Sequence, residues 1–228
     1  MIRYAMFDYG NVLVHFDTLK FYDFLRTHQR LGSRDVKGIF RNLDCLSEFD
    51  LGRIKVDEMF NGVKEALGLD VKKSDFLFAY TEVIKPDHKM VSIKKILREN
   101  SVNLAVVSNI NSYHYHYVQL VHPEVFSGFD YLMLSFQHGF KKPDPRMWDV
   151  PAEQLSIRPE ECFFIDDLEE NIAAFERWGG IGHHYDVIDE KYCPNGRLEI
   201  ERNRLLVRMT QLGMLSPAQA SSIAQVTF

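Results

Sequence analysis

Cysteine is scarce in this chain, and the few that occur form no recognisable pattern. The 228 residues include three, at Cys45, Cys162 and Cys193, which are widely spaced, odd in number and without a Cys-x-x-Cys pair. This excludes a disulfide framework and the usual zinc spacings, and it is typical of reduced thiols in the cytoplasm. Cys162 falls in an apolar run, where a small buried residue is a simpler interpretation than a nucleophile.

Long apolar runs and a basic surface are also missing. No stretch approaches the roughly 20 apolar residues that cross a bilayer. The first residues resemble a strand, so we expect no signal peptide there. The formal net charge is −5, with no cluster of Lys and Arg on one face. We therefore expect a cytoplasmic protein that binds neither nucleic acid nor a membrane. The sequence leaves its oligomeric state open.

What the chain does have is enough apolar and aromatic residues for a full core. Hydrophobic residues make up 46% of it, and 17 Phe and 10 Tyr argue against disorder. Short apolar runs, typical of buried strands, alternate with segments of helical periodicity. The runs lie at residues 4–7, 104–107, 132–134, 162–165 and 181–185. This alternation predicts an α/β fold with a parallel sheet and right-handed crossovers.

A long helical segment interrupts the alternation. From about residue 16 to residue 84 the apolar residues recur at helical spacing, and Gly68 stands where a helix commonly ends. Near the C-terminus, Ser216 to Gln219 have the form of a capping box at the start of a helix. The predicted division is a core at residues 1–15 and 87–200, an inserted helical cap at residues 16–86, and a C-terminal helical extension at residues 201–228.

Polar residues follow three of the predicted strands. Asp8 follows the first run, Ser108 the second, and Asp166 with Asp167 the fourth. Since the carboxyl ends of parallel strands meet at one edge of a sheet, where ligands bind, these side chains are expected to share a site. Lys142 lies in a loop of the same region. A carboxylate, a hydroxyl, an ammonium and a carboxylate pair suit a phosphate ester held against Mg²⁺, so phosphoryl transfer is the first hypothesis.

Each of these residues also has an ordinary structural interpretation. An isolated Asp8 is more often a loop or N-cap aspartate than a nucleophile. Adjacent acids at a helix start are favoured by the helix dipole, and a Ser-Asn pair after a strand is a common turn. The order of the segments along the chain is what favours a functional interpretation.

Four segments in order carry a resemblance to a known family. They are Phe-Asp-Tyr-Gly-Asn-Val at residues 7–12, Val-Ser-Asn at 107–109, Lys-Pro-Asp at 142–144 and Phe-Ile-Asp-Asp at 164–167, with Asn171 close behind. Over roughly residues 2–185 the chain resembles the haloacid dehalogenase-like hydrolase superfamily. Within it, the chain is similar to the phosphatase branch of bacterial sugar-1-phosphate phosphatases and the N-terminal domain of soluble epoxide hydrolases. The resemblance implies a Rossmann-like three-layer core with the helical cap between the first two segments.

The resemblance also implies a nucleophile and a metal site. Asp8 is expected to attack phosphorus and form an aspartyl-phosphate that water then hydrolyses. Its carboxylate, the carbonyl of Gly10 and one or both of Asp166 and Asp167 are expected to hold Mg²⁺, with substrate phosphate and water completing the coordination. Asp167 is the first choice for the direct ligand. Asp166 is expected either to bind through water or to hold Lys142.

Further residues are expected to assist the phosphate and the acids. The Ser108 hydroxyl and the backbone N–H groups around Asn109 are expected to hydrogen-bond the phosphoryl oxygens. Lys142 is expected to offset negative charge on the phosphate and on the nucleophile. Asn171, about one helical turn beyond the acid pair, is expected to support the acids by hydrogen bonds.

Gly10 is the main departure from the family pattern. Most phosphatases of the superfamily carry a second aspartate there, which protonates the leaving group and then deprotonates the attacking water. General acid catalysis is typically worth ~10²–10⁴-fold, so its absence favours substrates whose leaving group needs little protonation, such as anomeric sugar phosphates or acyl phosphates. The phosphatase branch named above shares the Asp-x-Gly-Asn pattern. His15 and Asp17 are candidates for a substitute, against their interpretation as a loop histidine and an N-cap.

Other ionisable residues near the motifs are expected to have no part in the chemistry. Lys141 is expected to be solvated, because the spacing of the Lys-Pro-Asp segment selects its neighbour. His114 and His116 have no zinc-like spacing and are expected at the surface or half-buried.

The expected function is a Mg²⁺-dependent phosphatase acting on a small phosphorylated metabolite, with a sugar phosphate as the first candidate. Three alternatives stay open. One is a phosphotransferase that passes the phosphoryl group to an acceptor other than water. Another is a metal-independent haloacid dehalogenase. The third is a non-catalytic binding protein of the same fold, which the missing acid at Gly10 motivates.

Overall fold

The computed structural model describes residues 1–30, 35–187 and 197–225, and Cys193 lies outside these ranges. A five-stranded parallel sheet forms the centre of the described structure, in the order β5-β4-β1-β6-β7. Its strands are β1 (Tyr4–Phe7), β4 (Asn103–Ser108), β5 (Tyr131–Leu134), β6 (Cys162–Asp166) and β7 (Ile181–His184). The predicted runs match these strands to within about a residue at each end, so the α/β fold with a parallel sheet is confirmed.

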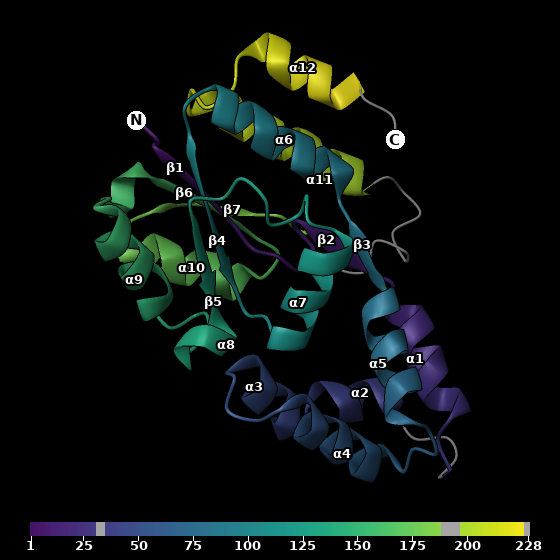
Figure 1. Ribbon diagram of the computed structural model, residues 1–228. Coiled ribbons are helices and arrows are strands. Elements are labelled where there is room, and N and C mark those ends of the chain that lie inside the picture. Colours follow the sequence, from purple (N-terminus) through teal and green to yellow (C-terminus); the bar gives the residue numbers. More distant parts are fainter. Residues whose placement is uncertain (31–34, 188–196, 226–228) are drawn as a thin grey trace.

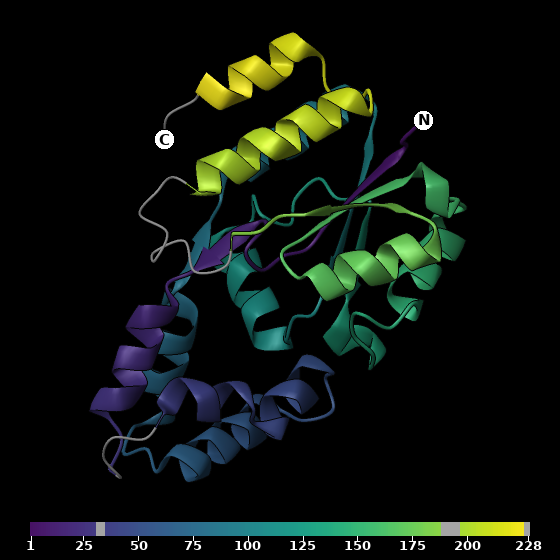
Figure 2. The same cartoon turned by 180° about the vertical axis from the view of Figure 1, so that it is seen from behind.

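Alternate residues of the strands face two separate helical layers. On β1, Ala5 and Phe7 belong to one hydrophobic core, whereas Tyr4 and Met6 belong to another. Helices on opposite faces of the sheet close the two cores (Figures 1 and 2). On the first face lie α6 (His88–Glu99), α7 (Ser112–Val121) and α11 (Arg197–Gln211); on the second lie α9 (Arg146–Leu155) and α10 (Glu169–Trp178). This arrangement is the expected three-layer, Rossmann-like core.

A short antiparallel ribbon leads from the sheet into the helical segment and back. It pairs β2 (Val14–Phe16) with β3 (Ile84–Pro86). The sequence predicts no separate strand at residues 84–86, because three residues are too few to show the alternation of a strand. The ribbon therefore attaches the inserted segment to the core along two neighbouring strands.

The inserted segment forms a helical cluster with a hydrophobic core of its own. Its described helices are α1 (Thr18–Thr27), α2 (Val36–Arg41), α3 (Asp44–Asp50), α4 (Val56–Leu67) and α5 (Lys73–Glu82). Gly68 ends α4 in the left-handed conformation, with φ of 60°, as its position predicted. Figure 1 shows the cluster at one end of the molecule, beyond the ribbon. We propose that this cluster is the inserted cap and call it the cap below.

The cap contacts the core where α3 lies against the short helix α8 (Ser135–His138). The Ser135 hydroxyl donates to the Asp50 carbonyl at 2.6 Å, and Arg53 donates to the Gly139 carbonyl at 3.2 Å. Lys141 donates to the Ser47 hydroxyl at 2.8 Å, so the expectation of a solvated lysine is wrong. The cap is therefore docked against the loops at the carboxyl end of the sheet.

The C-terminal helices pack on the face opposite α9 and α10. Leu205 and Met209 of α11 belong to the main hydrophobic core, and α12 (Pro217–Gln225) lies outside α6 and α11 (Figure 2). The predicted capping box is confirmed, because the Gln219 N–H donates to the Ser216 hydroxyl at 3.2 Å and the Ser216 N–H to the Gln219 side-chain oxygen at 2.9 Å. None of the helices in the described ranges combines the length and hydrophobicity that a membrane crossing requires.

Candidate active site

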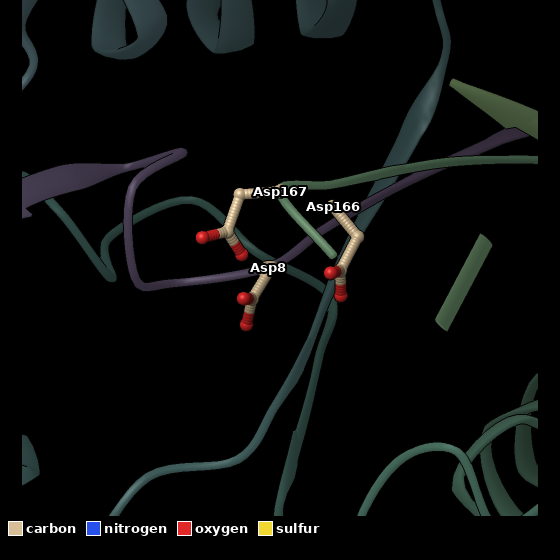
Figure 3. Close-up of side chains that lie close together, drawn as sticks. All are labelled: Asp8, Asp166 and Asp167. Atoms are coloured by element: carbon tan, nitrogen blue, oxygen red, sulfur yellow. The ribbon is translucent and has the colours of Figure 1, made fainter. Parts of the chain in front are cut away.

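Three aspartates converge at the carboxyl ends of two neighbouring strands. Asp8 directly follows β1, Asp166 ends β6 and Asp167 comes next. The Asp8 N–H donates to the Ile165 carbonyl at 2.9 Å, which continues the sheet hydrogen bonding as far as this residue. Oxygens from all three carboxylates lie within 4.8 Å of one another, and Figure 3 shows the side chains gathered at this edge. The parallel topology thus assembles an acidic cluster from residues that are far apart in the sequence.

Lys142 joins two of these acids. Its ammonium lies 2.8 Å from Asp8 Oδ1 and 2.6 Å from Asp166 Oδ2, and its side chain is fully buried. Asp8 Oδ1 also accepts the N–H of Tyr9 at 2.7 Å. Among the described residues these donors contact Oδ1 and none contacts Oδ2, so Oδ2 is the oxygen available to attack an electrophile or to bind a cation.

Asp166 is held by donors on both of its oxygens. Oδ1 accepts the Leu168 N–H at 2.8 Å and the Asn171 amide at 2.9 Å. Oδ2 accepts Lys142 and, at 3.1 Å, the same Asn171 amide. Asp166 is therefore oriented to hold the lysine, and Asn171 contacts one member of the acid pair, Asp166. Asp167 accepts an amide N–H from Asn11 at 2.7 Å and lines the adjoining cavity.

Crowding of the carboxylates alters their protonation. Burial raises the pKa of Asp8 from 3.8 to about 7; Lys142 opposes this rise, and the two neighbouring aspartates add to it. Burial likewise raises the pKa of Asp167, while the Asn11 hydrogen bond opposes it. For Lys142, burial lowers the pKa, but Asp166 and Asp8 outweigh burial and raise it above its usual value. The cluster therefore has more negative charge than the single lysine compensates.

This donor set fits a divalent cation that prefers oxygen ligands. Three buried carboxylates stand against one buried ammonium. Burial is the main cause of the raised pKa of Asp8 and repulsion by Asp166 and Asp167 adds to it, so an added cation would favour the charged form of Asp8. Asp8 and Asp167 both line the cavity and can reach such an ion, whereas Asp166 is already engaged with Lys142. Mg²⁺ is commonly bound by one or two protein carboxylates together with water and substrate phosphate.

Ser108 and Asn109 have different environments. Ser108 ends β4 and is fully buried, and its hydroxyl has no hydrogen-bond partner among the described residues. A buried hydroxyl without a partner is costly, so an acceptor from a ligand would satisfy it. The Asn109 side chain instead binds the backbone of Lys142 twice, accepting from its N–H at 2.8 Å and donating to its carbonyl at 3.1 Å. Asn109 thus positions the lysine loop.

The loop after Asp8 turns sharply at Gly10 and Asn11. Asn11 adopts a left-handed conformation, with φ of 55°, and its amide reaches Asp167. Gly10 lines the cavity, and a Cβ added there would lie 3.2 Å from the ring of Phe16. Sequence reasoning missed Asn11, although Asn is among the residues that most readily adopt this conformation.

The two suggested substitutes for the missing acid are engaged elsewhere. His15 Nε2 lies 2.8 Å from Asp87 Oδ2, which also accepts from Arg202. Asp17 is the N-cap of α1 and accepts the Lys20 N–H at 3.2 Å. Neither residue lines the cavity beside Asp8.

A cavity of about 200 Å³ opens beside the acids. One wall comes from the strand ends of the core, and the other comes from the cap and the start of α7. The cavity is lined by Asp8, Tyr9, Gly10, Asn11, Phe16, Asp50, Tyr80, Asn109, Ile110, Asn111, His114 and Asp167.

Sequence reasoning missed most of the second wall. Asp50 and Tyr80 come from the cap, and Asn111 hydrogen-bonds both of them at 3.2 Å. His114 is buried rather than at the surface, and burial lowers its pKa to about 4. The expectation for His114 is wrong because Tyr80 of the cap covers it, with ring centroids 4.2 Å apart. Such contacts leave no local pattern in the sequence.

Comparison with known proteins places this geometry in a family. Residues 2–179 match the model of a hydrolase family, the haloacid dehalogenase-like hydrolases. The chain is 25% identical over 181 residues to a sesquiterpene phosphatase of Aspergillus oryzae, a match that covers 79% of this chain and 88% of the relative. It is 27% identical over 193 residues to a D-ribitol-5-phosphate phosphatase of Bacteroides thetaiotaomicron, covering 78% and 89% of the two chains.

Solved structures agree on the fold. A HAD family enzyme of Bacteroides thetaiotaomicron, a mutant in complex with magnesium and inorganic phosphate, superposes with a TM-score of 0.70 at 22% identity. The superposition covers 84% of this chain and all of that one. An L-2-haloacid dehalogenase of Xanthobacter autotrophicus superposes with a TM-score of 0.61 at 16% identity over 96% of this chain. At these identities the structural likeness concerns the fold alone.

Proposed function

Because the chain belongs to the haloacid dehalogenase-like hydrolase family, we propose that this hydrolase is a Mg²⁺-dependent phosphomonoesterase of small phosphorylated metabolites. The observation that carries the proposal is the buried cluster of Asp8, Asp166 and Asp167 with Lys142 between two of them. Two relatives covered over most of their length are named as phosphatases, which supports the same reaction class.

The geometry supports an aspartyl-phosphate route. Oδ2 of Asp8 attacks phosphorus, the bond from phosphorus to the ester oxygen breaks, and the leaving oxygen takes up a proton. Water then attacks phosphorus, the bond to Asp8 breaks, and phosphate leaves. Lys142, fixed by Asp166 and by the Asn109 contacts to its backbone, offsets charge on the nucleophile and on the phosphoryl oxygens. The unpartnered Ser108 hydroxyl donates to a phosphoryl oxygen.

Asp8 and Asp167 would hold Mg²⁺ directly, with the Gly10 carbonyl as a further oxygen ligand and Asp166 acting through water. When bound, the ion supplies charge neutralisation for the phosphoryl group. Asn11 keeps Asp167 turned toward the cavity, and Asn171 keeps Asp166 turned toward the lysine. These hydrogen bonds pre-orient the acids before substrate arrives.

The cavity limits the substrate to a small organic group. About 200 Å³ lies beside the acids, walled by the rings of Phe16, Tyr80 and His114 and by polar Asn111. Such a mixed wall can pack against the apolar face of a polyol or sugar while hydrogen-bonding its hydroxyls. A sugar or sugar-alcohol phosphate is therefore our first candidate, and the D-ribitol-5-phosphate phosphatase among the relatives agrees with it.

The alternatives differ in what they require of the acids. A metal-independent dehalogenase would have to admit a haloacid carboxylate beside Asp166 and Asp167, which would repel it. A phosphotransferase would share the aspartyl-phosphate and differ only in the acceptor. A binding protein would have no need for a nucleophile held by a buried lysine.

Phosphate release from a panel of sugar, polyol and acyl phosphates tests the proposal. We expect release with Mg²⁺, loss of release with chelator, and loss in Asp8→Asn. Asp144→Asn is the matched control, since Asp144 pairs with Arg146 and does not line the cavity. Release from none of these substrates by folded protein with Mg²⁺, or equal release by Asp8→Asn, would contradict the proposal. Dehalogenation of a haloacid in the presence of chelator would favour the dehalogenase instead.

A further inference from the structure

The reaction just described needs a proton donor that the nucleophile loop lacks. Gly10 has no side chain, and the two nearby candidates are bound to other partners, His15 to Asp87 and Asp17 to the N-terminus of α1. Any substitute must reach the same cavity as Asp8. The candidates for the proton donor are therefore the ionisable side chains of the second wall, which are Asp50, Tyr80 and His114.

Asp50 is held over the cavity by contacts from the core. It is the last residue of α3 in the cap, and its Oδ1 accepts the Asn111 amide at 3.2 Å. Its backbone carbonyl accepts the Ser135 hydroxyl at 2.6 Å, and that hydroxyl also binds Ile110. Although α3 belongs to the cap, the carboxyl group is therefore positioned by residues of the core. Its half-buried side chain opens toward the cavity that it shares with Asp8.

The docking of this helix depends on a glycine. Gly52 has a positive φ of 67°, and a Cβ at this position would collide with the carbonyl oxygen of Phe136 in α8. Such a close approach of two backbones is possible only without a side chain. It brings the end of α3, and with it Asp50, against the strand ends of the core.

The surroundings of Asp50 suit a group that gains and loses a proton near neutral pH. Burial raises its pKa from 3.8 to about 6, while the Asn111 hydrogen bond and the nearby ammonium of Lys141 oppose the rise. Across the cavity lie Asp8 and Asp167, whose charges a bound cation and Lys142 offset. A general acid is most effective when its pKa lies near the working pH.

The other two ionisable groups of this wall cannot take the role. Burial lowers the pKa of His114 to about 4, so its ring is neutral near pH 7 and is a poor acid. Burial raises the pKa of Tyr80, so its hydroxyl keeps its proton. The hydroxyl also lies 3.2 Å from the Asn111 amide nitrogen.

We propose that Asp50 is the general acid and base of this hydrolase, supplied by the cap in place of a side chain at Gly10. In the first step the Asp50 carboxyl gives its proton to the ester oxygen as the bond to phosphorus breaks and the bond from Asp8 forms. In the second, the Asp50 carboxylate takes a proton from the attacking water as the bond from Asp8 to phosphorus breaks. The net reaction is one ester and one water converted to one alcohol and one phosphate. The proposal rests on the phosphatase function proposed above.

Leaving-group dependence in Asp50→Asn tests this proposal. The change keeps the size of the side chain and an oxygen that can accept from Asn111. First-turnover rates are compared for ribitol 5-phosphate, whose alkoxide must be protonated, and 4-nitrophenyl phosphate, whose leaving group needs little protonation. We expect a loss of about 10²–10⁴-fold with the alkyl ester and at most several-fold with the nitrophenyl ester. The nitrophenyl ester should also show a burst of nitrophenolate followed by slow turnover, because water is no longer deprotonated.

Two companion variants separate this role from a structural one. Glu48→Gln removes another carboxylate of α3, which pairs with Arg53 and does not line the cavity, and should leave the leaving-group dependence unchanged. Asp50→Glu keeps the acid and should restore the alkyl ester rate in part. Equal losses on both esters in Asp50→Asn, or no loss, would overturn the role of Asp50 while leaving the phosphatase intact. No release of phosphate by the unmodified protein would overturn both.

Discussion

The two walls of the cavity are built in different ways. On the core wall, Asp8 lines the cavity and pairs with Lys142, which also pairs with Asp166, and these residues are held by strand ends or by backbone contacts. On the cap wall, Asp50 and Tyr80 meet the core through side chains at the start of α7 and in α8: Asn111 hydrogen-bonds both, Ser135 binds the Asp50 carbonyl, and the His114 ring lies against Tyr80. The core wall carries a buried cluster of charges, whereas the cap wall belongs to a separate helical cluster that is attached by a two-stranded ribbon.

This difference separates two tasks in catalysis. In the proposed mechanism, strand ends in a packed sheet fix the nucleophile and the phosphate site to high precision. A cluster attached by the ribbon of β2 and β3 can open to admit substrate and close to exclude water. If the proton donor belongs to the cap, protonation of the leaving group is possible only when the cap is docked. Closure and chemistry would then be coupled.

The largest expected effect comes from breaking the core wall. Lys142→Met removes the cation that lies 2.8 Å from Asp8 and 2.6 Å from Asp166. We expect phosphate release to fall about 10²–10³-fold, as when a group that stabilises transition-state charge is removed. The pH optimum should rise, because without the lysine the pKa of Asp8 goes up further. Lys141→Met loses a contact to Ser47 and one of the groups that hold down the pKa of Asp50, but it leaves Asp8 and Asp166 paired and should retain most activity.

The next effect concerns the attachment of the ribbon. Asp87 is buried, caps α6 through the Met90 N–H at 3.0 Å, and binds both His15 of β2 and Arg202 of α11. Asp87→Asn should lower the free energy of unfolding by about 3 kcal/mol, since it removes the buried carboxylate that pairs with His15 and with the half-buried Arg202, and leaves Arg202 only a longer contact to Glu199. Chemical denaturation measures the change. An exposed pair in the cap gives the control, because Asp57→Asn should change stability little.

The contribution of the Asp87 ion pairs to the free energy of unfolding should depend on pH. Burial raises the pKa of Asp87, but His15 and Arg202 outweigh burial and lower it from 3.8 to about 2. A depressed folded-state pKa adds stability that is present above the unfolded value and is lost as pH falls through the folded value. The stability difference between the unmodified protein and Asp87→Asn should therefore be constant above about pH 4 and shrink between pH 4 and 2. A difference that stays constant down to pH 2 would contradict the ion-pair explanation.

A smaller effect is expected from undocking the cap without touching the chemistry. Gly52→Ala places a methyl group against the Phe136 carbonyl oxygen and should displace α3. We expect about a 10-fold loss with alkyl phosphates and a smaller loss with 4-nitrophenyl phosphate. Gly128 also has a positive φ, of 76°, but has open space around a Cβ, so Gly128→Ala reproduces the backbone strain alone. Equal activity losses in both variants would show that docking of the cap at Gly52 has no part in the reaction.

The smallest expected effect comes from placing a new carboxyl group on the core wall in a variant that lacks the one on the cap wall. Gly10 is outside the left-handed region, and a Cβ there requires the Phe16 ring, 3.2 Å away, to shift slightly. In the Asp50→Asn background, Gly10→Asp should restore the alkyl phosphate rate several-fold. Gly10→Asn adds the same volume without a proton and should restore nothing. Equal rates for the two double variants would show that an acid at position 10 does not replace the function proposed for Asp50.

The same contrast explains what the sequence could predict. Strands such as residues 104–107 and 162–165 could be recognised from the sequence, because a parallel strand that is buried on both faces forms a continuous apolar run. The polar residues at their ends, Asp8, Ser108 and Asp166, could then be brought to one edge by topology alone. The helix end at Gly68 and the capping box at Ser216 could also be predicted, because helix ends require particular residues locally.

The cap wall could not be predicted in this way. Asp50 ends a seven-residue helix, and its contacts to Asn111 and Ser135 join residues 61 and 85 positions apart. The sequence predicts His114 at the surface or half-buried, since its spacing indicates no metal site, but Tyr80 covers it. The raised pKa of Asp50 comes from burial, which depends on how the cap docks. The spacing of residues within a single segment does not indicate how the cap docks on the core.

In the proposed mechanism, Asp8 carries the phosphoryl group between two steps. Peptide mass spectrometry of acid-quenched Asp50→Asn enzyme, during turnover of 4-nitrophenyl phosphate with Mg²⁺, tests this role, since slow hydrolysis should allow the intermediate to accumulate. We expect one added phosphoryl group on the peptide that contains Asp8, lost on treatment with hydroxylamine. A phosphoryl group on any other residue, or continued turnover with no phosphorylated peptide, would contradict it.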